Sequence, residues 1–178
     1  MPPRHPALPL VWLVSDVRND AALDAALRRL PRGSGVVFRH YHLSLPERRQ
    51  RFVAVRRLAR VRGHRVILAG SAAQARRWRA DGAYGDARTI GAGPAMLRLV
   101  TAHSLHETGH AARARADAIL LSPVFATRSH PGAPTLGILR FRLVAPRARM
   151  SVVALGGMTR HNARRLRWQR WAAIDGLS

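Results

Sequence analysis

Short apolar runs alternate with amphipathic segments along almost the whole chain. The runs are bounded by glycine, proline or serine and are apolar throughout, as in strands of a parallel sheet that is buried on both faces. The sequence therefore predicts strands at residues 10–15, 35–39, 65–69, 82–85, 97–102, 118–121, 152–155 and 171–174.

Between these runs, apolar residues recur at the spacing of one helix face. Helices are expected at residues 20–30, 45–62, 72–78, 105–115, 136–145 and 159–168. The second of these places its arginines on the outer face. No helix is predicted over the glycine-rich residues 89–95. Capping residues precede four of the helices: Asn19, Ser44 with Glu47, Ser71 with Gln74, and Ser104 with Glu107.

Eight strands that alternate with helices predict a small α/β protein, a (β/α)8 or TIM barrel. We expect one domain over residues 10–178 after a loose lead-in at residues 1–9. A three-layer doubly wound sheet is the alternative. No helix is predicted after the last strand, so we expect the barrel to lack a C-terminal eighth helix. The apolar strip left there hints at a homo-oligomer.

The composition restricts the classes of partner and of chemistry that we expect for this protein. The chain has 178 residues, a net charge of +22, 31 basic residues that are all arginine, and no cysteine. Disulfides, thiolate metal sites and lysine chemistry are excluded, and a reducing, cytoplasmic compartment fits. The charge would attract polyanions. However, the arginines are scattered and no nucleic-acid motif is present, so we expect no specific nucleic acid partner. We also expect no membrane partner, because no run approaches the length of a span.

The candidate chemistry lies where strands end. The run at residues 118–121 stops at Ser122-Pro123, and the run at 152–155 stops at Gly156-Gly157. Ligands of parallel sheets gather at the carboxyl ends of the strands. A Gly-Gly turn can present backbone N–H groups to a phosphate, because no Cβ blocks the approach.

Three segments in this order resemble the thiamine phosphate synthase and thiazole tautomerase superfamily. Residues 101–107 (Thr-Ala-His-Ser-Leu-His-Glu) resemble its Ser-x-His-Ser-Leu-x-Glu segment. Residues 122–127 (Ser-Pro-Val-Phe-Ala-Thr) resemble its Gly-Pro-Val-Phe-x-Thr loop. Residues 153–158 (Val-Ala-Leu-Gly-Gly-Met), followed by Asn162, resemble its Val-Ala-Ile-Gly-Gly-Ile turn.

The resemblance implies a TIM barrel that acts on phosphorylated small molecules. A synthase joins hydroxymethylpyrimidine diphosphate to thiazole phosphate and releases pyrophosphate with the help of Mg²⁺. The tautomerase instead shifts a double bond by proton transfer. Both bind a phosphate after the last strands. Residue by residue, the substrate-binding candidates are Thr101, Thr127, Ser129, His130, Gly156, Gly157, Asp175 and Gly176.

The chain departs from the synthase pattern on the side that serves the pyrophosphate and the metal. Val37, Tyr41 and Gly70 stand where the synthase has glutamine, lysine and aspartate, and His130 replaces a second lysine. Arg39 is retained, either as a catalytic cation for pyrophosphate or as one more solvated arginine. Mg²⁺ is expected only with synthase activity. The metal ligands are unknown, and Asp86 is a weak candidate.

Two histidine patterns have competing interpretations. His103 follows the fifth strand and is either a catalytic general acid/base or a packed, capping histidine. Residues 106–110 match the zinc-protease pattern His-Glu-x-x-His. We interpret that match as chance, because Glu107 serves the cap of a helix outside the barrel.

The sequence thus predicts a thiamine phosphate synthase-type transferase of thiamine biosynthesis. A thiazole tautomerase acting through His103 is the first alternative. A catalytically decayed protein that binds a phosphorylated ligand is the second.

Overall fold

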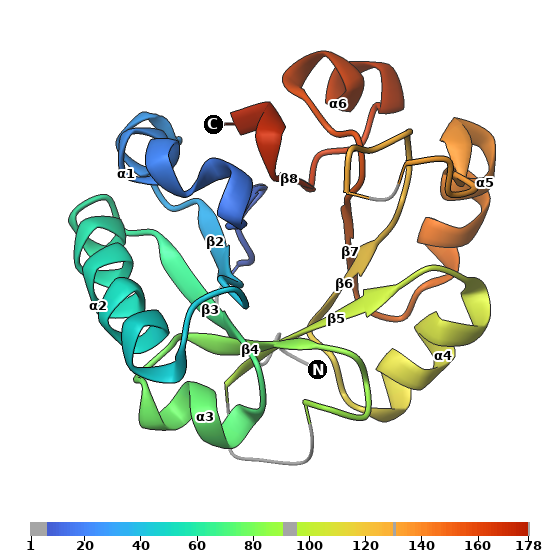
Figure 1. Cartoon of the computed structure of the whole chain (residues 1–178). Helices are drawn as coiled ribbons and strands as arrows, with labels where there is room; N and C mark the ends of the chain where they lie inside the picture. The colour runs from blue at the N-terminus through green and yellow to red at the C-terminus, as the bar shows by residue number, and fades with distance from the viewer. Residues whose placement is uncertain (1–6, 91–95, 130, 178) are drawn as a thin grey trace.

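The computed structural model describes residues 7–90, 96–129 and 131–177 as a closed barrel of parallel strands, as Figure 1 shows. The strands are β1 (Val11–Val14), β2 (Gly35–Phe38), β3 (Arg65–Ala69), β4 (Gly82–Gly85), β5 (Leu97–Ala102), β6 (Ala118–Leu121), β7 (Ser151–Ala154) and β8 (Trp171–Ala173). They follow one another around the barrel in chain order, and β1 closes the ring against β8.

A ring of helices covers the outside of the barrel (Figure 1). The helices are α1 (Asp20–Arg29), α2 (Leu45–Val61), α3 (Ala72–Arg77), α4 (Leu105–Arg113), α5 (Gly137–Val144) and α6 (Arg160–Leu166). There are also three short 3-10 turns in the described chain: η1 (Val17–Asn19) before α1, η2 (Ala145–Arg147) after α5 and η3 (Asp175–Leu177) after β8. No α-helix follows β8 in the described chain. The predicted barrel fold is therefore confirmed, and the doubly wound alternative is wrong.

Large apolar side chains fill the barrel interior. Trp12 is fully buried among inward-facing residues such as Ile67 and Leu120. A Cβ on Gly35 of the neighbouring strand would lie 2.0 Å from the indole ring of Trp12. Glycine at that position makes room for the indole, which lets one large side chain occupy the centre of a small barrel. Outside the strands, apolar faces of the helices complete two further core clusters.

Most of the predicted caps are present, and one is wrong. Ser44 and Glu47 form the capping box of α2, and Ser104 caps α4. Ser71 accepts from the N–H of Gln74 at the start of α3. The Asn19 side chain does not cap α1. The capping role at that turn belongs to Asp16, which begins η1, while the Asn19 amide donates to the carbonyl oxygens of Val14 and Ile174.

One arginine of α2 does not lie on the outer face. Arg48 is 8% exposed, and its guanidinium donates to the carbonyl oxygens of Arg39 and Ala69 over 2.7 and 2.6 Å. The side chain therefore ties the end of β2 to the end of β3. In the described part of the chain, no helix is long and apolar enough to cross a membrane.

Candidate active site

Two adjoining cavities open at the carboxyl ends of the strands. The larger, of about 640 Å³, is lined by residues at the ends of β2 to β8. The smaller, of about 180 Å³, lies between the loops that follow β6, β7 and β8. Thr127, Leu155, Gly156 and Ile174 line both, so the two cavities share a wall. A ligand with a ring and a phosphate could place one group in each.

The predicted site residues gather in these cavities. Six candidates line the larger one: Arg39, Thr101, His103, Thr127, Ser129 and Gly156. Asp86, the metal candidate, lines it as well. Five candidates line the smaller one: Thr127, Gly156, Gly157, Asp175 and Gly176. His130 lies outside the described residues.

The Gly156-Gly157 turn packs against the loop after β6 with no room for side chains. Gly156 has φ +95°, and a Cβ there would lie 2.6 Å from Cα of Pro123. Gly157 has φ +60°, and its Cβ would lie 2.4 Å from the carbonyl oxygen of Ala126. Both the backbone conformation and the close approach require glycine.

The same turn leaves backbone donors free. Phe125 donates its N–H to the Gly156 carbonyl over 3.1 Å, and the Asn162 amide donates to the Gly157 carbonyl over 2.7 Å. Among the residues that the structure describes, the N–H groups of Gly156 and Gly157 donate to no protein acceptor. Two N–H groups beside a small cavity are donors that an anion can accept from. Arg128, an exposed side chain in the same lining, adds positive charge.

A backbone contact sets the orientation of His103. Its Nδ1 lies 2.8 Å from the carbonyl oxygen of Ser122, and a carbonyl oxygen only accepts, so Nδ1 carries the proton. In the neutral ring, Nε2 is then an unprotonated acceptor. The backbone N–H of His103 donates to Glu107, which fixes the residue at the start of α4. The imidazole lines the larger cavity with one nitrogen able to take a proton.

On the opposite wall, Arg39 leaves β2 toward the larger cavity. Its guanidinium lies 5.6 Å from the ring centre of Tyr41, and its Nη1 is 3.9 Å from the Asp16 carboxylate. Burial raises the pKa of Asp16. Hydrogen bonds from Arg18 and the charges of Arg18 and Arg39 outweigh burial and hold that pKa below its ordinary value. Arg39 is thus half-exposed, held near an anion, and available to an acidic ligand.

A buried polar chain fixes the backbone beneath Arg39. The Arg39 N–H donates to Ser15 Oγ over 2.9 Å, and Ser15 Oγ lies 2.8 Å from Nδ1 of His40. Nε2 of His40 is 2.8 Å from the Asp20 carboxylate, which Arg51 also contacts at 2.8 Å. A carboxylate only accepts, so Nε2 carries the proton and Nδ1 accepts from the serine hydroxyl. Ser15 and His40 are fully buried. These hydrogen bonds therefore support the backbone, and Ser15 is not a nucleophile.

Tyr84 places a phenol in the larger cavity beside the fifth strand. Its hydroxyl is hydrogen-bonded to Thr101. Burial raises the pKa of the Tyr84 hydroxyl, although the charge of Arg39 and the bond to Thr101 act in the opposite direction. The phenol therefore stays neutral near neutral pH and orients the Thr101 hydroxyl.

The donor set does not fit an Mg²⁺ ion held by the protein. Asp86 is the one carboxylate in the described lining of the larger cavity. Its Oδ1 accepts the N–H groups of Arg88 and Thr89, its Oδ2 accepts the Thr89 hydroxyl, and the bonds from Thr89 lower its pKa. In the described chain, no group of three or more His, Asp or Glu side chains could hold a metal. Mg²⁺ requires near-octahedral oxygen coordination, and a single carboxylate that already accepts three hydrogen bonds supplies little of it.

The His-Glu-x-x-His segment lies on α4, outside the barrel. The rings of His106 and His110 are 4.4 Å apart between centroids, and Glu107 is engaged by His103 and Ser104 as the capping interpretation expects. Chance remains our interpretation of this match. Zinc analysis of the purified protein tests it, and one bound zinc per chain would contradict it.

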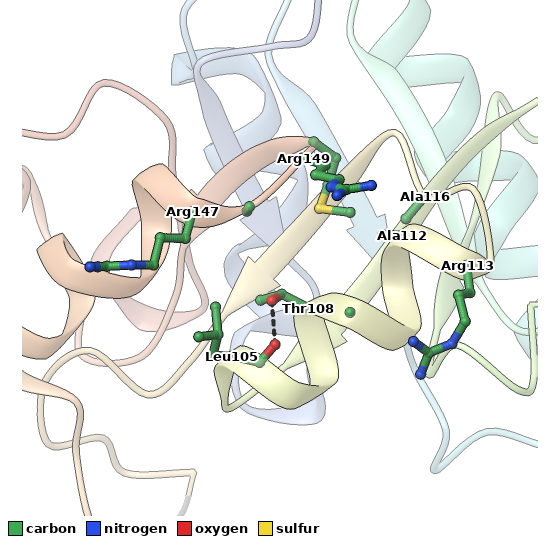
Figure 2. Close-up of a pocket in the computed structure, with 10 residues that line it drawn as sticks. Leu105, Thr108, Ala112, Arg113, Ala116, Arg147 and Arg149 are labelled. Carbon is green, nitrogen blue, oxygen red and sulfur yellow. Dashed lines mark hydrogen bonds between the residues drawn. The ribbon is translucent and has the colours of Figure 1, made fainter.

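A third cavity, of about 590 Å³, lies on the outer surface between α4 and the segment before β7 (Figure 2). Thr108 and Arg113 of α4 line one side, and Arg147 and Arg149 line the other. It shares no lining residue with the two cavities at the strand ends. None of the predicted site residues lies there.

Sequence reasoning missed several residues of the mouth. Tyr84 could have been predicted as a site residue, because it lies near the carboxyl end of a predicted strand. No local sequence pattern predicts Arg18 or His40 as a site residue. The partners of Arg18 include Ser129 and Asp175, which are far away in the chain.

A closed (β/α)8 barrel with its cavities at the carboxyl ends of the strands is the architecture of a large class of enzymes. The sequence model of the thiamine monophosphate synthase family matches residues 11–177. The chain therefore belongs to the thiamine monophosphate synthase family.

The relatives agree with this assignment. A protein of Aquifex aeolicus, provisionally named thiamine-phosphate synthase 2, is 42% identical over 66 residues, which is 37% of this chain and 36% of that protein. The thiamine phosphate pyrophosphorylase of Pyrococcus furiosus superposes with a TM-score of 0.73 at 20% identity, over 92% of this chain and 84% of that one. The Bacteroides thetaiotaomicron pyrophosphorylase gives 0.62 at 14% identity, over 92% and 81%.

The similarity to these solved structures supports the fold and nothing beyond it. FabK of Thermotoga maritima superposes with a TM-score of 0.63 at 13% identity, over 96% of this chain and 62% of that one. FabK thus superposes about as well as the Bacteroides thetaiotaomicron pyrophosphorylase does, and the reaction has to be argued from the site.

Proposed function

We propose that this protein binds a phosphorylated thiazole and joins it to hydroxymethylpyrimidine diphosphate, forming thiamine phosphate and pyrophosphate. The observation that carries the proposal is the pair of adjoining cavities. The smaller one offers the N–H groups of Gly156 and Gly157 to a phosphate. The larger one has the volume of a small-molecule site and Arg39 on its far wall.

The reaction exchanges one bond for another. The thiazole ring nitrogen forms a bond to the methylene carbon of the pyrimidine, and the bond from that carbon to the diphosphate oxygen breaks. The electron pair of the broken bond leaves with pyrophosphate. Arg39 binds the departing anion, because a guanidinium can donate two parallel hydrogen bonds to it. The phosphate of the thiazole anchors the nucleophile beside the pyrimidine, which lowers the entropic barrier to attack.

The protein's residues do not form a magnesium site, so no step is assigned to a metal that they hold. Arg39 is then the cation on which departure of the diphosphate depends. Substitution of Arg39 by alanine is expected to lower the rate by at least about a hundredfold, the scale of losing one group that stabilises developing charge.

The test is release of pyrophosphate from the two substrates, measured with and without added Mg²⁺. We expect release that requires both substrates and that falls in Arg39→Ala. Arg49→Ala, on an exposed position of α2, is the matched control and should react like the wild type. No release at high enzyme concentration would overturn the synthase proposal.

The geometry of His103 favours a second candidate, a proton-transfer tautomerase. Nδ1–H is held by the Ser122 carbonyl, which leaves Nε2 as the base of an imidazole that lines the larger cavity. Nε2 would take a proton from one carbon of a thiazole phosphate carboxylate, the double bond would shift, and the proton would return to another carbon. A positioned general base contributes about 10²- to 10⁴-fold.

Solvent deuterium separates the two reactions. A tautomerase should incorporate deuterium into the thiazole ligand in D₂O, and His103→Gln should lose that exchange while it still binds the ligand. A synthase should release pyrophosphate without such exchange. Saturable binding with neither activity would identify a binding protein that has lost its catalysis.

A further inference from the structure

Arg18 lies at the seam where the barrel closes, and its guanidinium contacts three separate segments. Nε is 3.1 Å from the Asp16 carboxylate in its own turn. Nη2 donates to Ser129 Oγ over 2.8 Å, in the loop after β6. Nη1 is 3.4 Å from the Asp175 carboxylate, just after β8. Ser129 lines the larger cavity and Asp175 lines the smaller one, so Arg18 contacts a lining residue of each cavity.

The negative charge of Asp175 does not suit an anion-binding cavity, unlike the other polar groups that line the smaller cavity. The free N–H groups of Gly156 and Gly157 and the side chain of Arg128 suit an anion. A carboxylate in the same lining would repel that anion unless a cation neutralises it. Among the described residues, the Arg18 guanidinium is the cation that contacts Asp175.

We propose that Arg18 binds the phosphate group of the ligand, and that Asp175 is the counterion that it releases when the phosphate enters. This inference rests on the phosphate site of the proposed function. The contact to Asp175 is the longest of the three that Arg18 makes, so it is the one most easily exchanged. The two shorter contacts, to Asp16 and Ser129, hold the guanidinium in place while a phosphate oxygen replaces the carboxylate.

Arg18 suits this role better than Arg128. The Arg128 side chain is exposed and makes no hydrogen bond or ion pair in the described chain, so binding would have to order it. Arg18 is already ordered by its partners. Its bond to Ser129 also joins the loop after β6 to η1, so the guanidinium is fixed relative to that loop before a phosphate binds.

Equilibrium binding of inorganic phosphate tests the proposal, at pH 8 and constant ionic strength. Arg18→Gln should weaken binding about tenfold or more, because a charge-assisted hydrogen bond is lost. Asp175→Asn should tighten binding several-fold, because the competing anion is removed. Arg29→Gln removes the same charge from an exposed position at the far end of α1 and should bind like the wild type.

Equal phosphate binding in wild type and Arg18→Gln, or weaker binding in Asp175→Asn, would overturn the proposal, as would a wild type that binds no phosphate. If Arg18→Gln does not fold, Arg18→Lys keeps the charge but loses the three-way contact, and it should bind more weakly than the wild type. The outcome is separable from that of the reaction. Phosphate binding without turnover would overturn only the synthase, and turnover with equal binding in all variants would overturn only the role of Arg18.

Discussion

The two sides of the barrel mouth are built on different principles. After β6, β7 and β8, backbone packs on backbone: Val124 and Phe125 donate to the carbonyls of Leu155 and Gly156, and glycines allow the approach. After β2 and β3, side chains make the connections. Arg48 reaches from α2 to the carbonyl oxygens of Arg39 and Ala69, and its guanidinium lies near the rings of three aromatic side chains.

This difference explains which chemistry each side can support. A turn that offers backbone N–H groups keeps those donors as long as glycine remains, whatever side chains surround it. The opposite side binds through side chains, and its capacity changes with each residue. Arg39 remains there as a cation, while Asp86 is a single carboxylate occupied by its own turn. Phosphate binding is therefore the better supported half of the proposed function.

The largest effect is expected where the backbone packing is closest. Gly157→Ala would place a Cβ 2.4 Å from the Ala126 carbonyl oxygen at φ +60°. Strain and overpacking together should cost about 2–5 kcal/mol of the free energy of unfolding. Gly132→Ala is the matched control, since φ is +75° and nothing lies within 4 Å of its Cβ. It should lose only about 1–2 kcal/mol.

Urea unfolding measures both free energies, and inorganic phosphate binding accompanies it. Gly157→Ala should also lose phosphate binding, whereas Gly132→Ala should keep it. Equal destabilisation of the two variants would show that the turn does not depend on its contact with the loop after β6.

An intermediate effect is expected on the side-chain side. Arg48→Met keeps the apolar contacts but leaves the carbonyls of Arg39 and Ala69 without their buried donor. Each unsatisfied carbonyl costs about 1–3 kcal/mol, partly offset because a buried charge is no longer desolvated. We expect a net loss of about 2–3 kcal/mol in the free energy of unfolding.

Arg49→Met, at the exposed neighbouring position, should change the free energy of unfolding by less than about 0.5 kcal/mol. Phosphate binding should persist in both variants, because the smaller cavity lies across the mouth. Loss of phosphate binding in Arg48→Met would contradict the separation of the two sides.

The sequence predicted the side of the barrel mouth after β6, β7 and β8 better than the side after β2 and β3, for a physical reason. Strands such as β3 and β6 were located to the residue, because apolar runs stop at glycine or serine. The Gly-Gly turn was found because its geometry depends on its own residues. The role of Arg48 was not found, because helical periodicity cannot show that a long side chain reaches back to strand ends.

The cap of the first helix failed for a related reason. Asp16 and Asn19 are both good capping residues three positions apart, and local preference does not choose between them. The choice is made by tertiary contacts, since the Asn19 amide bonds to the carbonyl of Ile174 at the other end of the chain. The support beneath Arg39, from Ser15 through His40 to Asp20, likewise joins segments that no local pattern connects.

The smallest effect is expected in the pH dependence of that support. Burial lowers the pKa of His40, although the bond to Asp20 acts against it, so the folded state holds His40 neutral. The unfolded chain binds a proton at about pH 6.5, which means that stability falls as the pH drops below this value toward the folded pKa. His40→Gln removes this proton uptake but keeps a donor and an acceptor. Between pH 7.5 and 5.5 the free energy of unfolding of the wild type should fall by up to about 1 kcal/mol more than that of His40→Gln.

Burial also lowers the pKa of His64, so His64→Gln is the control that measures how much of the pH dependence comes from this second buried histidine. Phosphate binding should be unaffected in both variants. An identical pH dependence in wild type and His40→Gln would show that His40 is not held neutral, and the polar chain beneath Arg39 would then carry its proton in another arrangement.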